Sequence, residues 1–164
     1  MLDALIINQG IEHLYEMKLA HFRSRELLSL MKHQILISNA QQRKTGNVKG
    51  ATLRAVKEGI YEFVFDIVKA EPELAWSNDL KSRSIFSVAV QYRHAKTFSL
   101  IYGLDIKGAL TSSVDEFYGN NLLHTAGMLA ASTSLNDIPG AALQMQRELQ
   151  WFKVISLTFN SSVF

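Results

Sequence analysis

The sequence predicts an all-α fold, in which helical pairs stack as a repeat solenoid between an N-terminal helical cap and a long C-terminal helix. First, matching segments recur at an offset of 34 residues, the period of helix-turn-helix repeat arrays. Second, the apolar residues inside each unit follow a helical spacing rather than a strand's alternation. Third, the 164 residues are 48% hydrophobic and 20% charged, with two prolines, which suits a globular helical domain.

Residues 1–48 are predicted to form the N-terminal helical cap and a polar loop. Gly10–Ile37 has two apolar faces, one carrying Ile11, Leu14, Tyr15, Leu19 and Phe22 and the other Leu27, Leu30, Met31 and Ile35. The stripe changes face near Ser24, so we expect either a kinked helix or two helices. Gln41–Gly50 is rich in polar residues and is predicted to be the loop.

Residues 49–134 are predicted to hold about three degenerate repeats, at 49–80, 81–114 and 115–134 onward. The first and second units match at a spacing of 34 residues, and the third begins 37 residues after the second. Small residues in the first helix of each unit allow a neighbouring helix to approach closely, and these are Ala55, Ala89 and Ala126.

Each unit is expected to turn sharply between its two helices. Gly59 suits this turn because glycine adopts a positive φ without a Cβ clash. The second helix of the first unit has an i, i+3, i+4, i+7, i+8 stripe formed by Ile60, Phe63, Val64, Ile67 and Val68. Pro72 follows this helix, where it interrupts no hydrogen bond.

Residues 135–164 are predicted to form a linker helix and a frayed tail. Gly140–Val154 is rich in good helix formers, and Pro139 stands just before it, as helix starts permit. Ile155–Phe164 is rich in β-branched residues, Ser and Asn and does not continue the helical pattern, so we expect it to fray.

The third unit resembles a known repeat signature. Gly119–Ala126 reads G-N-N-L-L-H-T-A, which is similar to the ankyrin signature G-x-T-P-L-H-x-A, and its matching residues are Gly119, Leu123, His124 and Ala126. Asn121 and Leu122 replace the usual Thr-Pro, while Ser87 and Leu53 replace the histidine in the second and first units. The fold predicted on this resemblance is an ankyrin-type stack.

The chain resembles more closely a plant family of ankyrin-repeat proteins with a C-terminal PGG membrane domain. The resemblance covers roughly residues 10–154, and its most specific part is the glutamine-rich run Gly140–Lys153, which looks like that family's linker helix. It implies a protein-protein interaction module, found in multipass plasma-membrane proteins of defence and stress signalling, with the repeats on the cytosolic side. The chain ends before that domain, so we expect a truncated or alternatively spliced product.

Composition excludes several classes of function. There is no cysteine, so a disulfide framework, a thiolate zinc site and a cysteine nucleophile are all absent. No apolar run reaches the roughly 20 residues of a transmembrane helix, and the first ten residues lack the basic start of a secretory signal. These features predict a cytoplasmic location. No phosphate-binding glycine loop or hydrolase elbow is present, and we expect neither an enzyme nor a cofactor.

The ionisable residues that suggest chemistry have structural interpretations that we favour. The resemblance gives His124 a hydrogen bond to backbone in the turn. His13, His21 and His33 are spaced at eight and twelve residues, whereas zinc ligands on one helix stand three or four apart. Glu12 and Glu16 suit a solvated helix face, and no metal site is expected. Trp76 is expected to pack between repeats.

The predicted mechanism is non-covalent recognition of other proteins through the concave face and the turns. The candidate contacts are Lys81, Arg83, Tyr118 and Asn120, and also Trp151 at the end of the linker helix. A full-length membrane homologue is one candidate partner, because a regulatory or non-functional fragment is an alternative interpretation. A second alternative is nucleic-acid binding, since residues 1–57 hold nine Lys/Arg against four Asp/Glu.

Overall fold

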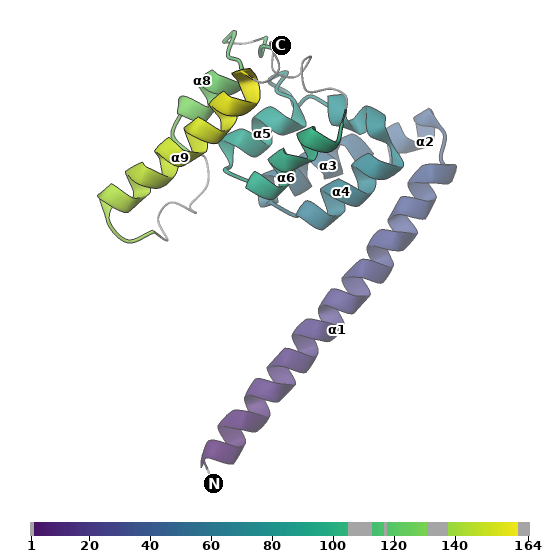
Figure 1. The fold of residues 1–164 in the computed structure, drawn as a ribbon. Coiled ribbons are helices and arrows are strands. Elements are labelled where there is room, and N and C mark those ends of the chain that lie inside the picture. Colours follow the sequence, from purple (N-terminus) through teal and green to yellow (C-terminus); the bar gives the residue numbers. More distant parts are fainter. Residues whose placement is uncertain (1, 105–112, 117, 131–137, 161–164) are drawn as a thin grey trace.

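The computed structural model describes residues 2–104, 113–116, 118–130 and 138–160, and the prediction of an all-α fold is confirmed for this part of the chain. Its only pairing of β type is an isolated antiparallel bridge between Asn78 and Ser84. Short helices form a compact body, from which the first helix projects (Figure 1). No helix in these ranges is long and apolar enough to cross a membrane.

Helix α1 spans Leu2–Ile37 without interruption, so the prediction of a kink or of two helices near Ser24 is wrong. The Ser24 hydroxyl donates to the Ala20 carbonyl at 2.7 Å, which keeps serine inside the helical ladder. Near its end, α1 packs on α4 (Tyr61–Ala70) and buries Ile35. Of the second predicted apolar face only Ile35 is buried, while Leu27 and Leu30 are 59% and 65% exposed.

The predicted loop Gln41–Gly50 is largely helical, which corrects the sequence-based assignment. It holds α2 (Ala40–Thr45) and the start of α3 (Val48–Glu58). A capping box begins α2, because Asn39 and Gln42 exchange side-chain and backbone hydrogen bonds at 2.8 and 3.0 Å. The reason for the error is that α2 buries none of its residues and therefore has no apolar stripe.

The remaining helices form pairs that stack side by side. The first pair is α3 and α4, the second is α5 (Ile85–Gln91) and α6 (Ala95–Ser99), and the third is α8 (Leu122–Gly127) and α9 (Ala141–Asn160). Two 3₁₀ turns, η1 (Pro72–Trp76) and η2 (Leu100–Gly103), follow the second helices of the first two pairs. Helix α3 packs on α5 and α5 on α8, while α4 packs on α6 (Figure 1).

The small residues predicted for the first helices lie at these contacts. Ala55, Ala89 and Ala126 are all buried in the hydrophobic core. A methyl side chain lets neighbouring helix backbones approach closely, so one alanine in each first helix suits a tightly stacked row. Large apolar side chains from the second helices, including Ile67 and Phe98, complete the buried set.

The 34-residue offset of the sequence reappears in the backbone. Gly59 and Arg93, which stand 34 positions apart, both follow a first helix with left-handed φ angles of 72° and 62°. The Gly59 turn is held from the next unit, because the His94 Nε2 atom lies 2.9 Å from the Lys57 carbonyl oxygen. A Cβ at Gly59 would lie 2.6 Å from the His94 ring, so this position requires glycine.

Helix α9 extends to Asn160, so the prediction of a frayed end is wrong for residues 155–160, and 161–164 lie outside the described residues. Ile155 and Thr158 are buried, and the Trp151 ring meets Phe98 edge-on at a centroid distance of 6.1 Å. Packing against α6 and α8 thus overrides the weak helix propensity of this segment. Helix α9 completes the third pair rather than leading away from the body.

Candidate protein-binding groove

A basic groove lies between α3 and the loop that closes at the Asn78–Ser84 bridge. Its cavity has a volume of about 680 Å³. We define the basic groove by the three lysines and two leucines that give it its character, which are Lys49, Leu53, Lys57, Leu80 and Lys81.

Helix α3 supplies one wall of the basic groove. Lys49, Leu53 and Lys57 are spaced by four residues and therefore share one face of the helix. Leu53 packs against the hydrophobic core and fixes the orientation of that face. The two lysines therefore stand on a wall whose position is set by the core.

The opposite wall is a tight loop organised by Asp79. Its carboxylate accepts hydrogen bonds from the backbone N–H groups of Lys81 and Arg83 at 2.9 and 3.0 Å. The Arg83 guanidinium also donates to the same carboxylate through Nε at 2.9 Å and Nη2 at 2.5 Å. Ser82 takes a left-handed φ of 56° in this turn. The carboxylate therefore fixes the loop from inside.

Leu80 stands at the tip of this loop and is 99% exposed. A fully exposed leucine on a loop that is fixed by four hydrogen bonds to Asp79 offers an apolar anchor at little ordering cost. The basic groove thus combines an apolar anchor with charge.

The three lysines of the basic groove form no ion pair within the described ranges of the chain. Arg83 is paired with Asp79, and Arg54 at the rim is paired with Glu58 at 3.1 Å. In contrast, Lys49, Lys57 and Lys81 have no ion pair with any carboxylate in the described part of the chain. Three unpaired ammonium groups around one hollow create a positive potential that attracts anionic groups.

The pKa of Asp79 is lowered. Burial, which is the largest single influence, raises this pKa, but the hydrogen bonds from the Arg83 side chain and from the backbone N–H groups of Arg83 and Lys81 together outweigh it. A carboxyl group with a lowered pKa stabilises the folded state above its unfolded pKa, which is near 3.8, and loses this effect as the pH falls through the folded value.

Replacing Asp79 by Asn is therefore expected to lower the free energy of unfolding by about 1–3 kcal/mol at pH 7, because charge-assisted hydrogen bonds are lost. The difference in the free energy of unfolding between the wild-type and Asp79→Asn proteins should shrink as the pH falls below the ordinary carboxyl pKa. Urea unfolding at pH 7 and at about pH 3 measures both values. A difference that stays constant over this pH range would contradict the anchoring role.

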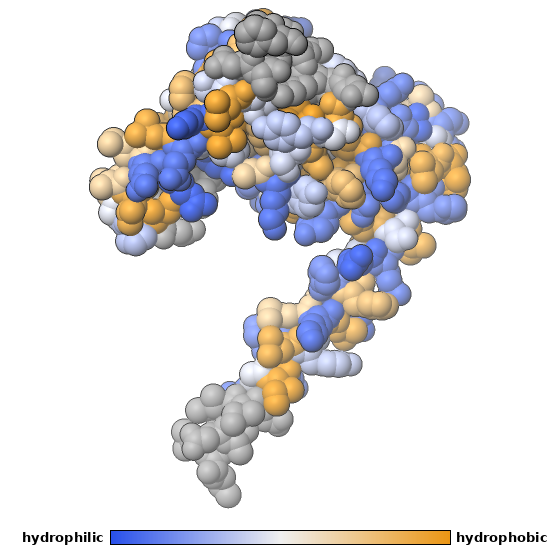
Figure 2. Space-filling model, in the orientation of Figure 1, coloured by the Kyte–Doolittle hydropathy of each residue, from blue (hydrophilic) through white to orange (hydrophobic). Residues whose placement is uncertain are grey.

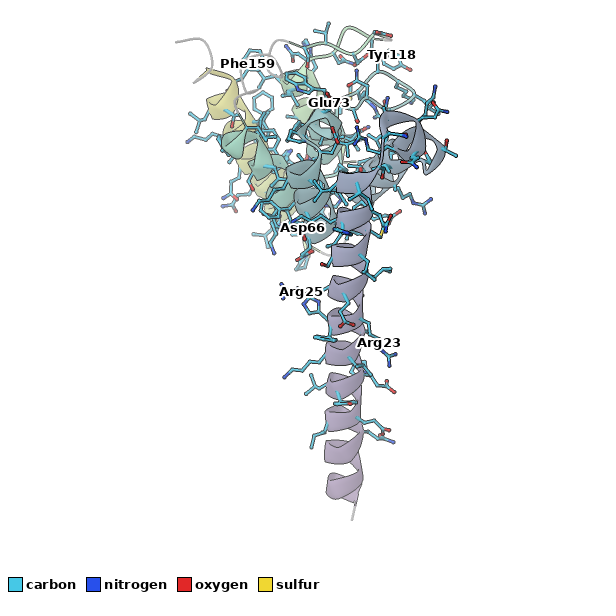
Figure 3. All side chains as sticks on the ribbon, turned by 90° about the vertical axis from the view of Figure 1, so that its right-hand side faces the viewer. Arg23, Arg25, Asp66, Glu73, Tyr118 and Phe159 are labelled. Carbon is cyan, nitrogen blue, oxygen red and sulfur yellow. The ribbon has the colours of Figure 1, made fainter. Side chains whose placement is uncertain are left out.

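Four of the predicted contact residues meet at one place. Lys81, Arg83, Tyr118 and Asn120 all line a small hollow of about 80 Å³ beside the basic groove. Tyr118 is 73% exposed there and lies at the top of the body in the side view (Figure 3). Arg83 is held by Asp79 and Gln91, which makes it a structural residue rather than a free contact.

A second aspartate next to this hollow also fixes its loop by accepting hydrogen bonds from backbone N–H groups. The Asp115 carboxylate accepts the backbone N–H groups of Tyr118 and Asn120 at 2.6 and 3.2 Å. The Ser82 hydroxyl donates to Glu116 at 2.7 Å and ties the two loops together. The exposed loops therefore form one connected edge beside the basic groove.

The other predicted site residues lie elsewhere. Trp151 is partly buried against the core, and its buried Nε1 has no hydrogen-bond partner among the described residues, so it is not a free contact residue. Trp76 is 48% exposed at the end of η1 and does not fill the space between repeats. His124 Nδ1 accepts the backbone N–H of Asn121 at 3.2 Å. No cluster of three metal-ligating side chains occurs within the described ranges.

Sequence reasoning missed Lys49, Lys57 and Leu80. The prediction of a polar loop over residues 41–50 includes Lys49 and therefore does not place it on a helix face with Lys57. The spacing of Lys49, Leu53 and Lys57 by four residues is a signal in the sequence. It indicates a shared face once residues 48–58 are predicted to be helical. The position of Leu80 at a loop tip depends on Asp79, and Asx turns of this kind have a sequence signal in the Asn-Asp pair at 78–79.

The class that the fold and the groove define is an all-helical protein of stacked helical pairs with an exposed basic groove. No protein-family model, curated protein or solved structure matches this chain.

Proposed function

We propose that this chain is a protein-protein interaction module of the ankyrin type, whose basic groove binds an acidic segment of another protein. The observation that carries the proposal is the grouping of Lys49, Lys57 and Lys81 around the exposed side chain of Leu80. Ankyrin-type stacking of helical pairs is supported by the packing of α3, α5 and α8 in a row. The proposed relationship to the plant family with a PGG membrane domain rests on Gly119–Gly127 and Gly140–Lys153 alone.

The partner segment is expected to combine carboxylates with one apolar side chain. Carboxylates of such a segment would replace the missing ion partners of the three lysines and accelerate encounter by charge attraction. Its apolar residue would cover Leu80 and remove that surface from water, which stabilises a complex by about 25 cal/mol per Å². Recognition of this kind needs no covalent step, cofactor or metal.

The test uses a synthetic acidic peptide with one central leucine and measures its affinity by fluorescence anisotropy. Reversing two charges of the basic groove, with Lys49→Glu and Lys57→Glu together, should weaken binding about tenfold or more. The matched control is Lys96→Glu with Lys153→Glu, which makes the same change in net charge at exposed positions on α6 and α9. This control should retain affinity within about twofold.

Leu80→Ser separates specific recognition from simple charge attraction. It should remove the preference of the protein for the peptide with leucine over one in which leucine is replaced by serine. An equal loss of affinity in the groove variant and in the control variant would contradict the proposal that the peptide binds in the basic groove. If the protein bound duplex DNA more tightly than the peptide, and its affinity for DNA fell steeply as the salt concentration rose, the nucleic-acid alternative would be favoured instead.

A further inference from the structure

Helix α1 leaves the body and exposes large apolar side chains along its free part. Its rise of about 1.5 Å per residue carries it far beyond the contact with α4 (Figure 1). Ile11, Tyr15 and Phe22 are 59%, 66% and 59% exposed. Hydrophobic colouring is visible on this projecting stretch in the space-filling view (Figure 2). Most helices in proteins gain their stability from packing, so a long exposed stretch with large apolar side chains is a candidate interaction surface.

These three residues form one stripe. At about 100° per residue, Ile11, Tyr15 and Phe22 fall within about 40° of one another around the helix. The stripe is turned by roughly 110° from the face of Leu28, Lys32 and Ile35 that meets α4. A second helix can therefore cover the stripe while α1 stays packed on the body.

The charges beside the stripe are arranged in a particular order. Glu12, Glu16 and Arg23 also fall within about 40° of one another, on the flank that faces away from α4. Glu12 and Glu16 are one turn apart and repel each other. Arg23 lies about 10 Å further along the axis from Glu16, which leaves it too distant to pair along a straight helix. Figure 3 shows Arg23 on the part of α1 below the body.

We propose that α1 pairs in antiparallel fashion with α1 of a second copy of this chain. Placing Tyr15 opposite Phe22 of the second copy puts Arg23 of that copy level with Leu14, midway between Glu12 and Glu16. The two-fold symmetry repeats the same contacts at the other end. In a parallel pair this flank of the two copies would lie on opposite sides of the interface, so Arg23 would not meet the glutamates of the other copy. The charge order therefore selects an antiparallel copy as the occupant of the stripe.

Lys18 lies near the two-fold axis of this pair, opposite Leu19 of the second copy. Its methylene stem covers apolar surface while its ammonium group reaches water. The two ammonium groups repel each other, and the contact is short, so the pairing is expected to be reversible and dependent on concentration.

Sedimentation velocity of the full chain over a range of concentrations tests the pairing. The wild-type chain should form a dimer, and Arg23→Glu should raise the dimer dissociation constant about tenfold or more, because two attractive sites become repulsive. Lys44→Glu, an equal charge change on exposed α2, should leave the constant unchanged. Combining Arg23→Glu with Glu12→Lys and Glu16→Lys should restore the dimer, which excludes unfolding as the cause of the loss.

Single cysteines determine the orientation, because the natural chain contains none. Lys18→Cys should form a disulfide with its copy, since the two positions meet near the axis within the reach of about 7 Å between Cα atoms. Ile11→Cys should not, because its copy lies about 22 Å away along the axis. A monomer at all concentrations, equal weakening by Arg23→Glu and Lys44→Glu, or cross-linking at both cysteines would overturn the proposal.

Discussion

Arg93→Ala is expected to lower the free energy of unfolding by about 2–4 kcal/mol, because it removes one partner of a largely buried ion pair. The Arg93 side chain is 8% exposed, and its guanidinium donates to the Glu148 carboxylate at 2.9 and 2.5 Å. It also donates to the carbonyls of Val90, Ala126 and Met128 at 2.8, 3.3 and 2.6 Å. One side chain therefore joins α5, α8 and α9.

Two further variants identify why Arg93→Ala lowers the free energy of unfolding. Arg54→Ala removes an exposed pair with Glu58 and should cost less than about 0.5 kcal/mol. Arg93→Gly also loses the guanidinium but relieves the left-handed φ of 62°, so it should be more stable than Arg93→Ala by about 1 kcal/mol. Chemical denaturation measures all three. Equal effects of Arg54→Ala and Arg93→Ala would contradict the linking role of Arg93.

Trp151→Ala is expected to cost about 2–4 kcal/mol of unfolding free energy, because the indole fills space between α9 and the core. Its ring contacts Phe98 edge-on, and Ile155, one turn further along, is fully buried. The neighbouring Phe152→Ala is the matched control, since Phe152 stands on the same helix but is 42% exposed. The control should cost less than half as much.

Trp151→Phe adds a finer comparison. Phenylalanine retains much of the apolar contact and removes Nε1, a buried donor with no hydrogen-bond partner in the described part of the chain. Its cost should therefore stay below about 1.5 kcal/mol. Thermal or urea unfolding monitored by circular dichroism provides the comparison. A stable Trp151→Ala protein would mean that α9 is only loosely attached to the stack.

The helical pairs were predictable because their signal is repeated. The apolar stripes of α3–α6 recur at 34 residues, and Ala55 and Ala89 occupy the same place in successive units. The errors fall where that signal is missing. Helix α2 depends on the Asn39–Gln42 capping box rather than on an apolar face. The end of α9 is helical because tertiary packing buries Ile155 and Thr158, which single-residue propensity does not report.

The candidate site was only partly predictable. Lys81, Arg83, Tyr118 and Asn120 were found because they stand in turns, and they do line one hollow. Lys49 and Lys57 were not found, because their common face depends on where α3 begins. The structural role of Arg83 depends on the carboxylate of Asp79, and a sequence does not reveal which charges neutralise one another inside the protein.

The projecting helix α1 also changes what one binding groove can achieve. If two chains pair through α1, each assembly carries two basic grooves, joined by a defined spacer instead of a flexible tether. A partner with two suitably separated acidic segments would then be held by avidity, since the second binding event becomes intramolecular. A partner with one segment would gain nothing. The length of α1 would thereby set which spacing of acidic segments is recognised.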